Sequence, residues 1–278
     1  MYTLNCKGRI LEINKPLVMG IINITPDSFF TGSRQQQLDG ILRQAEKMLL
    51  EGAAVLDIGG QSTRPGSDLI AVEEELQRVV EPVKTLHEHF PEAFISVDTF
   101  YSKVAKETVE NGACIINDIS GGTLDDDMLA AVGKLNVPYI CMHMRGTPQN
   151  MHEFAHYENV TREVLDFFVE RIDLCKKNGI HDVIVDPGLG FAKTFAHNFE
   201  ILKNLSLLKI LEKPLLIGLS RKGMIYRTLG TTAEEALNGT TVLNTVSLMN
   251  GANILRVHDV REAVEAVKLV DAINSVHP

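Results

Sequence analysis

The stretch "MGIINITPDSFF", Met19 to Phe30, decides between the two folds that best fit this chain. It begins as a buried strand, in which only Gly20 and Asn23 interrupt the large apolar side chains. An open doubly wound sheet usually places a G-x-G-x-x-G turn after its first strand. No such turn follows here, because Pro26 breaks the strand without one. The stretch therefore favours a closed barrel.

The same alternation of short β-rich runs and amphipathic segments continues along the chain. Eight such units in 278 residues predict a (β/α)8 TIM barrel, with residues 1–278 forming one domain. The expected strands are Leu17–Asn23, Val55–Gly60, Phe94–Thr99, Cys114–Ile119, Tyr139–His143, Val183–Asp186, Leu215–Ser220 and Ile254–His258. The expected helices are Gln35–Glu51, Val72–His89, Ser102–Asn111, Asp126–Leu135, Val160–Lys177, Phe195–Leu211, Ala233–Met249 and Val260–Ile273.

Local signals refine this outline at three places. A short hairpin with its turn at Lys7 and Gly8 precedes the first barrel strand and is expected to cap the barrel bottom. Thr232 and Glu235 have the spacing of a capping box before one helix. Asp259 is expected to be the N-cap of the last helix.

Composition restricts the possible partners. A net charge of −9 argues against nucleic acid or an anionic membrane as the main partner, although a local basic cluster could still bind a small anion. No apolar run approaches the ~18 residues that a membrane span needs. The four cysteines form no C-x-x-C pair, and the first residues lack the apolar region of a signal peptide. We therefore expect a cytoplasmic protein with reduced thiols.

Polar residues recur where the expected strands end. Side chains alternate between the two faces of a strand, so Ile184 and Asp186 share a face, as do Ile254, Arg256 and His258. The same pattern places Asn23, Asp98, Asn117 and Lys222 at strand ends. Taken singly, an Asp or Asn there often only caps a helix or ties a turn. An inward-facing arginine, however, needs a partner, and the whole set favours an active site at the carboxyl rim.

Seven motifs carry a family resemblance. In chain order they are "MGIINITPDSFF", "DIGGQSTRPG", "ISVDT", "IINDISGG", "DPGLGF", "LSRKGMI" and "RVHDV". They span nearly the whole chain, and together they resemble the bacterial dihydropteroate synthases of folate biosynthesis. The resemblance implies a homodimeric (β/α)8 barrel. It also implies a reaction that joins a dihydropterin diphosphate to 4-aminobenzoate and gives 7,8-dihydropteroate and diphosphate.

The resemblance also implies which residues hold each part of the substrates. For the pterin these are Asp98, Asn117, Ile119, Met142, Asp186, Gly218, Lys222 and Arg256. For the diphosphate they are Asn23, Thr63, Arg256, Val257 and His258, with Asn23 also the ligand of Mg²⁺. For 4-aminobenzoate they are Phe29, Thr63, Arg64, Pro65, Phe191, Lys222 and Gly223. The catalytic set is Asn23, Lys222, Arg256 and His258.

The chemistry of the implied reaction needs these residue types. One carboxylate, Asp186, can accept two adjacent N–H groups of a pterin edge, and the amide of Asn117 can both donate and accept. The departing diphosphate builds negative charge, which Arg256 and His258 could stabilise. An aromatic amine is already a nucleophile at neutral pH, so no Ser–His–Asp machinery is expected. The "TPDSFF" and "STRPG" loops are expected to close over the second substrate.

Four departures from the family pattern stand in this chain. Phe30 and Thr31 occupy places where many relatives have Ser and Asp, so the first loop lacks a carboxylate that could assist the metal or diphosphate. Gln61 replaces a Glu, and Gly223 replaces a Ser on the amine-substrate side. The stretch "GLGFAK" stands where relatives have "GFGFGK". No departure falls on the residues expected to read the pterin.

Two other functions are compatible with such a barrel. One is a catalytically silent pterin-binding paralogue, which would be expected to lack Asn23, Arg256 or His258; all three are present. The other is a protein similar to methyltetrahydrofolate–corrinoid methyltransferases, which needs no diphosphate site. A zinc site is less favoured, because His143 and its neighbours His152 and His156 are expected to be loop or surface residues.

Overall fold

The computed structural model describes residues 1–24, 34–62 and 66–276. Phe29, Thr63, Arg64 and Pro65, which were expected near the second substrate, lie outside these ranges, as does the Phe30–Thr31 departure. The geometry of the site is accordingly built from the other residues.

Within these ranges, ten strands form two sheets. Strands β1 (Tyr2–Cys6) and β2 (Arg9–Ile13) pair antiparallel. The parallel strands are β3 (Leu17–Asn23), β4 (Val55–Gly59), β5 (Phe94–Asp98), β6 (Ile115–Asp118), β7 (Tyr139–Met142), β8 (Val183–Asp186), β9 (Leu216–Ile217) and β10 (Ile254–Val257). They follow the order β8-β7-β6-β5-β4-β3-β10-β9, and a bridge between Val185 and Leu215 joins the two ends of this row. The predicted (β/α)8 barrel is therefore confirmed.

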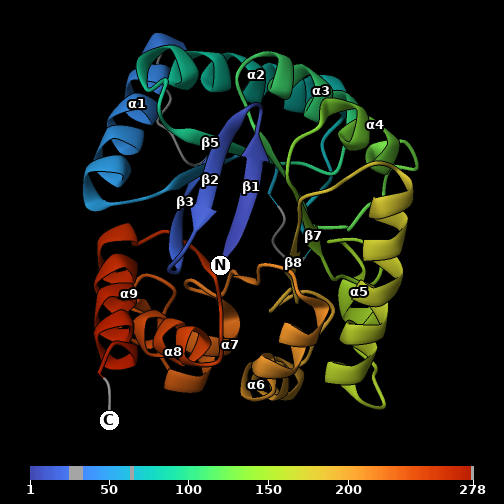
Figure 1. The fold of residues 1–278 in the computed structure, drawn as a ribbon, viewed down its shortest axis with the longest axis vertical. Helices are drawn as coiled ribbons and strands as arrows, with labels where there is room; N and C mark the ends of the chain where they lie inside the picture. Colours follow the sequence, from blue (N-terminus) through green and yellow to red (C-terminus); the bar gives the residue numbers. More distant parts are fainter. Residues whose placement is uncertain (25–33, 63–65, 277–278) are drawn as a thin grey trace.

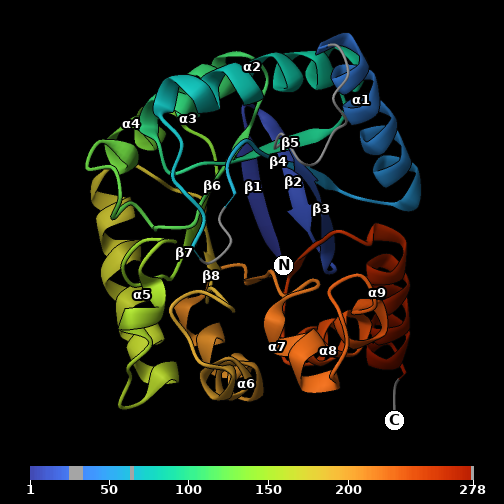
Figure 2. The same ribbon diagram turned by 180° about the vertical axis from the view of Figure 1, so that it is seen from behind.

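The helices surround the parallel strands, as the two opposite views in Figures 1 and 2 show. The α-helices are α1 (Arg34–Glu51), α2 (Val72–His89), α3 (Ser102–Glu110), α4 (Met128–Leu135), α5 (Val160–Lys177), α6 (Phe195–Lys203), α7 (Gly223–Leu229), α8 (Leu237–Met249) and α9 (Val260–Asn274). Two 3-10 helices, η1 (Met151–Phe154) and η2 (Leu205–Leu211), also lie in the part of the chain that the structure describes. Within the described residues, no helix is both long and apolar enough to cross a membrane.

The hairpin β1–β2 closes the amino-terminal end of the barrel, as predicted. Its turn places Lys7 at φ 54° and Gly8 at φ 85°, the left-handed conformations that a two-residue hairpin turn requires. The buried hairpin side chains pack on inward-facing residues low in the barrel, and this cluster includes Leu4, Leu11, Ile13, Met19, Val55, Ile115, Ile140, Ile184, Leu216 and Ile254. This apolar plug leaves the carboxyl end as the place for polar side chains.

The other face of each strand packs against the helices. These contacts form a second, larger apolar cluster. It contains Ile22, Leu56 and Ile58 together with apolar residues of the surrounding helices. The alternation predicted from the sequence therefore holds, with one face inside the barrel and the other under the helical layer.

Two helix predictions were wrong in their bounds, and one short helix was not predicted. The helix expected over Phe195–Leu211 ends at Lys203, and η2 follows with Leu205 and Leu208 buried at the three-residue spacing typical of a 3-10 helix. Helix α8 begins at Leu237, because the carbonyls of residues 233 and 234 accept from Arg221 and lie in a turn. The short helix α7, which begins at Gly223, was not predicted.

One capping prediction fails, and the other is confirmed in position but not in its side-chain hydrogen bond. Glu235 accepts from the hydroxyl of Thr231 rather than forming a box with Thr232 before the helix. Asp259 occupies the N-cap position of α9, but its carboxylate makes no cap hydrogen bond. Both of its oxygens accept instead from Arg221.

Candidate active site

The carboxyl ends of the strands place most of the predicted polar residues next to one another around the barrel mouth. Asn23 is in register with Gly59 on β4, and Gly59 with Asp98 on β5. Asp98 is in turn paired with Asn117 on β6, and Met142 on β7 with Asp186 on β8. Asp98, Asn117 and Asp186 are all buried. Side chains that are far apart in the sequence thus meet at the mouth of the barrel.

Arg256 crosses this ring and connects three strands. Its Nε donates to Oδ2 of Asp57 at 2.6 Å, and its Nη2 donates to Oδ2 of Asp98 at 2.7 Å. The amide of Asn117 donates to the same oxygen of Asp57 at 3.0 Å. The guanidinium is therefore fixed in position from two sides, and its other N–H groups make no hydrogen bond within the described residues.

Asp57 is a site residue that the sequence reasoning missed. Its side chain is fully buried, and it accepts from both Arg256 and Asn117. The signal was present, because Asp57 shares a strand face with Val55, which lies in the interior plug.

The charged groups at the mouth shift one another's pKa values. Burial raises the pKa of Asp98 to about 7, and Asp57 adds to this, while Arg256 opposes it. Burial acts to lower the pKa of Arg256, but the carboxylates of Asp57 and Asp98 outweigh it and hold that pKa above its ordinary value. Asp98 is thus able to change protonation near neutral pH while the arginine stays charged.

Asp186 and Lys222 form the other half of the polar mouth. Burial raises the pKa of Asp186, opposed by Lys222 and by the backbone N–H of Gly188. That N–H donates to Oδ1 of Asp186 at 2.8 Å. Burial lowers the pKa of Lys222 to about 8, with Asp186 opposing the shift. A side chain at Gly218 would begin 3.8 Å from Oδ2 of Asp186, so the glycine leaves space beside that carboxylate.

An apolar wall lies beside the polar groups. Three residues predicted to contact the substrates, Ile119, Met142 and Phe191, are buried in one small cluster with Phe100 and Met144. Nζ of Lys222 lies 4.6 Å from the ring centroid of Phe191. A flat heterocycle with a polar edge suits such a combination of apolar faces and directed polar groups.

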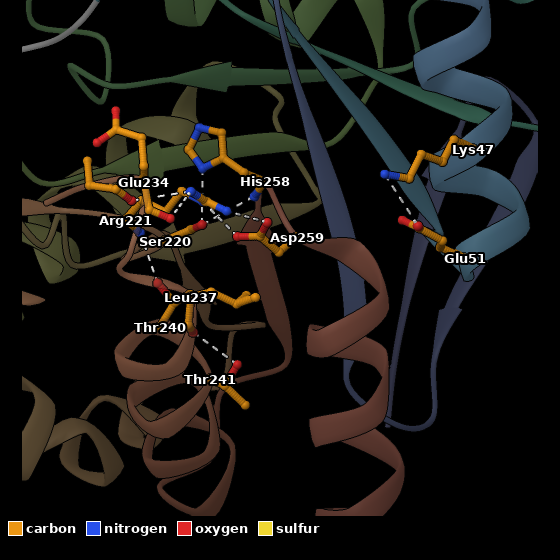
Figure 3. Close-up of polar contacts among 11 residues, drawn as sticks. Lys47, Glu51, Ser220, Arg221, Glu234, Leu237, Thr240, Thr241, His258 and Asp259 are labelled. Carbon is orange, nitrogen blue, oxygen red and sulfur yellow. Dashed lines mark hydrogen bonds and ion pairs between the residues drawn. The ribbon is translucent and has the colours of Figure 1, made fainter. Parts of the chain in front are cut away.

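His258 and its neighbours are tied to the loop that carries Lys222. Oγ of Ser220 lies 3.0 Å from Nδ1 of His258 and accepts from its backbone N–H at 3.2 Å. One residue further along, Arg221 makes a bidentate ion pair with Asp259, with both contacts at 2.8 Å. Figure 3 shows these two connections side by side. The loops after β9 and β10 are therefore held together at two successive positions.

Not every predicted residue points its side chain into the mouth. Val257 is fully buried under the helical layer, so only its backbone could face a ligand. Gly223 begins α7, where an added side chain would first meet the hydroxyl of Tyr226 at 3.5 Å. His143, expected in a loop or at the surface, is buried at the end of β7, because it packs edge-on against Phe167 and binds Lys193. Lys193 was not among the predicted site residues.

A metal would have few protein ligands here. Among residues 1–24, 34–62 and 66–276, no group of three or more His, Cys, Asp or Glu side chains could hold an ion. Asn23 is half-buried at the end of β3, and its Oδ1 is 3.6 Å from the position that a Cβ on Gly59 would take. A single amide oxygen fits a hard cation that takes its other ligands from water and from a bound anion.

Comparisons with known proteins agree with this geometry. The family model described as pterin binding enzyme matches residues 19–258. Dihydropteroate synthase of Escherichia coli strain K12 is 41% identical over 268 residues, which cover 96% of this chain and 94% of that protein. Dihydropteroate synthase of Clostridium beijerinckii is 39% identical over 259 residues, which cover 92% of this chain and 93% of that protein.

Solved structures are similar over almost the whole chain. The Yersinia pestis dihydropteroate synthase in a sulfonamide drug complex is 40% identical with a TM-score of 0.93, covering 99% of this chain and 100% of that one. The Xanthomonas albilineans dihydropteroate synthase in complex with 7,8-dihydropteroate is 36% identical with a TM-score of 0.90, again covering 99% and 100%.

Proposed function

Because this chain belongs to the pterin-binding enzyme family, among the dihydropteroate synthases, we propose that its barrel mouth condenses (7,8-dihydropterin-6-yl)methyl diphosphate with 4-aminobenzoate. The products are 7,8-dihydropteroate and diphosphate. One observation supports this most strongly: Arg256, Asp57, Asp98 and Asn117, from four different strands, form one buried network. The proposal treats residues 1–278 as one domain.

Recognition of the pterin would rest on the buried polar groups. Asp186 would accept two N–H groups of the ring edge, and Asn117 and Asp98 would bind the neighbouring ring atoms. Lys222 would donate to the ring carbonyl or to N5, while Ile119 and Met142 would cover a face. A ring with a different edge would leave one of these groups unpaired, at a cost of about 1–3 kcal/mol each.

In the displacement step, the bonds that form and break lie within the two substrates. The amine nitrogen of 4-aminobenzoate forms the new C–N bond to the pterin methylene, and the C–O bond to diphosphate breaks with its electron pair leaving on oxygen. The proton lost from nitrogen passes to solvent. Arg256 and His258 would stabilise the leaving anion, which is the largest contribution asked of the protein.

We infer that Mg²⁺ accompanies the diphosphate, with Oδ1 of Asn23 as its ligand from the described part of the chain. When bound, the cation neutralises negative charge on the phosphate oxygens. One neutral ligand predicts weak binding of the metal when diphosphate is absent.

The second substrate would bind beside Lys222. Phe191 would pack on the ring of 4-aminobenzoate, and Gly223 would leave room at the start of α7. By resemblance, Phe29, Thr63, Arg64 and Pro65 would complete this end of the site.

We also propose a homodimer that uses the face formed by α7 and α8. Leu229, Val242 and Met249 are more than half exposed there, at 57%, 53% and 64%. Large apolar side chains gathered on neighbouring helices are typical of a subunit interface. Light scattering of the wild type and of Val242→Glu tests this. A wild type with the mass of one chain would refute it.

Diphosphate release tests the proposed function directly. Purified protein, the dihydropterin diphosphate and Mg²⁺ should release diphosphate only after 4-aminobenzoate is added. Binding of the pterin without release would identify a silent paralogue instead. Methyl transfer from a methylated folate without use of the diphosphate would identify the methyltransferase.

A further inference from the structure

Lys193 holds a half-buried ammonium group among backbone carbonyls just behind the active-site mouth. Its Nζ lies 3.1 Å from the carbonyl oxygen of Gly188 and 3.0 Å from that of Phe191. It also lies 3.3 Å from the carbonyl oxygen of His143 and 2.8 Å from Nδ1 of the same residue. One side chain therefore binds both ends of the segment Gly188–Phe191 and ties it to the end of β7.

Every partner of this ammonium group is an acceptor. Burial lowers the pKa of Lys193 well below its ordinary value, and Asp186 opposes this shift. Three carbonyl acceptors nonetheless call for three N–H donors, which only the charged form supplies. Burial, and then Lys193, lower the pKa of His143, and in the tautomer that carries its proton on Nε2 the neutral ring also accepts through Nδ1.

The segment that Lys193 binds is pressed between two residues. Gly188 has φ +66°, and a Cβ there would lie 2.0 Å from the carbonyl oxygen of His143. Gly190 has φ +86°, and a Cβ there would lie 3.0 Å from Cδ of Lys222. Glycine is needed at both places, because L side chains rarely adopt these conformations and have no room. The segment thus fits closely between the end of β7 and Lys222.

The opposite side of the segment sets the position of Lys222. The carbonyl oxygen of Leu189 accepts from Nζ of Lys222, and the ring of Phe191 lies under the same ammonium group. Leu189 and Phe191 lie within the segment whose ends Lys193 binds. Displacing the segment would therefore move both an aromatic wall and a cation of the site.

We propose that Lys193 is a positioning residue, which fixes the segment Gly188–Phe191 so that Phe191 and Lys222 are held where 4-aminobenzoate binds. This rests on the proposed function, because it concerns how the second substrate is placed. Lys193 touches neither substrate. It acts through the segment, as a support for groups that do.

The test is Lys193→Met, which keeps the length of the side chain and removes its ammonium group. Diphosphate release measured with each substrate varied should show KM for 4-aminobenzoate raised at least ~10-fold. The Kd for a dihydropterin should rise by no more than about threefold, because Lys222 is one of several proposed pterin contacts and Asp98, Asn117 and Arg256 lie on other strands. A general structural defect would weaken the binding of both substrates to a similar degree.

Lys47→Met is the matched control. The side chain of Lys47 is 73% exposed on α1, and it pairs only across one helical turn with Glu51 at 3.7 Å (Figure 3). The same substitution there should leave both constants unchanged. Equal effects at the two sites would show that loss of a lysine charge anywhere is enough.

His143→Phe keeps the proposal testable if Lys193→Met fails to fold. It preserves an aromatic ring beside Phe167, whose centroid lies 4.8 Å away, and removes both ring nitrogens, including the Nδ1 that contacts Lys193. KM for 4-aminobenzoate should rise about threefold with pterin affinity unchanged. If Lys193→Met folds and has the wild-type KM for 4-aminobenzoate, the inference is overturned. If only His143→Phe folds, a wild-type KM in that variant overturns it. A wild type that releases no diphosphate would instead overturn the proposed function.

Discussion

Arg256 and Asp57 are 199 residues apart in the sequence, yet Nε of the arginine donates to Oδ2 of the aspartate at 2.6 Å. The same oxygen accepts from Asn117, so one buried carboxylate orients two of the groups proposed to read the pterin. The position of Arg256 between the proposed pterin and diphosphate sites thus depends on a residue that need touch neither substrate.

Asp57→Asn tests this dependence. It keeps the shape of the side chain but replaces an ion pair with a weaker hydrogen bond, so the free energy of unfolding should fall by about 1–3 kcal/mol. We expect kcat/KM to fall at least ~10-fold, because Arg256 is then held mainly by Asp98. Denaturant unfolding and diphosphate release measure the two effects.

Asp173→Asn provides the control for that change. Asp173 pairs with Lys177 on the exposed side of α5, with 56% of its side chain accessible. The substitution there should change neither quantity measurably. Wild-type turnover in Asp57→Asn would show that the carboxylate does not position Arg256.

The bidentate pair between Arg221 and Asp259 should be strongly coupled. Arg221→Gln, Asp259→Asn and the double variant form a cycle whose coupling free energy, from denaturant unfolding, should be about 1–3 kcal/mol. The single variants should also weaken diphosphate binding, because His258 adjoins Asp259 and shares its loop contacts with Ser220.

An exposed ion pair on α9 is the control for that coupling free energy. Arg261 and Glu265 are 72% and 56% exposed and lie 3.1 Å apart across one turn. Their coupling should stay below about 0.5 kcal/mol. A coupling of that small size at Arg221 and Asp259 would mean that the two loops are held together by other contacts.

Glu75 should make stability depend on pH. It is fully buried, its two carboxylate oxygens have no hydrogen-bond partner within the described residues, and burial raises its pKa to about 7 from an ordinary 4.5. The folded state therefore binds more protons than the unfolded state between these values. Its contribution to the free energy of unfolding falls as pH rises through this window, by at most about 3 kcal/mol.

Glu75→Gln removes that titration. The difference in the free energy of unfolding, variant minus wild type, should grow between about pH 4.5 and pH 7 and then level off. Measuring the difference isolates Glu75 from the other acidic groups that both proteins share. A difference that is constant with pH would show that Glu75 does not titrate in this range.

Lys222 should limit pterin binding at alkaline pH. Burial lowers its pKa to about 8, so affinity should fall as pH rises through that value and Asp186 loses a neighbouring positive charge. Lys222→Arg stays protonated, so its affinity, even if lower at neutral pH, should not show this decline up to about pH 9.5. Titrations at several pH values decide this, and parallel curves for the two proteins would contradict it.

Strand patterns predicted the barrel well because they depend on short-range alternation. The same alternation placed Asp98, Asn117, Asp186 and Arg256 at one rim. It did not show which of them contact one another, because the contact of Arg256 with Asp57 depends on closure of the sheet. Asp259 was assigned to a helix cap from its position alone, and only the tertiary structure reveals that Arg221 takes both of its oxygens.

Lys193 illustrates what no sequence pattern could show. Its partners are backbone carbonyls and one ring nitrogen. Because every residue has a backbone carbonyl, the sequence does not show which carbonyls will bind a lysine. The short helix α7 was missed for a related reason, since it begins with glycine and is too brief to show a helical period.

Isothermal titration of a dihydropterin into Asp186→Asn tests most directly whether the buried polar groups of separate strands bind one ring. Asp182→Asn is the matched control, because Asp182 lies just before the same strand at the opposite end of the barrel and accepts from the backbone of Asn5. We expect the control to bind like the wild type and Asp186→Asn to bind at least ~100-fold more weakly. Wild-type affinity in Asp186→Asn would contradict the account.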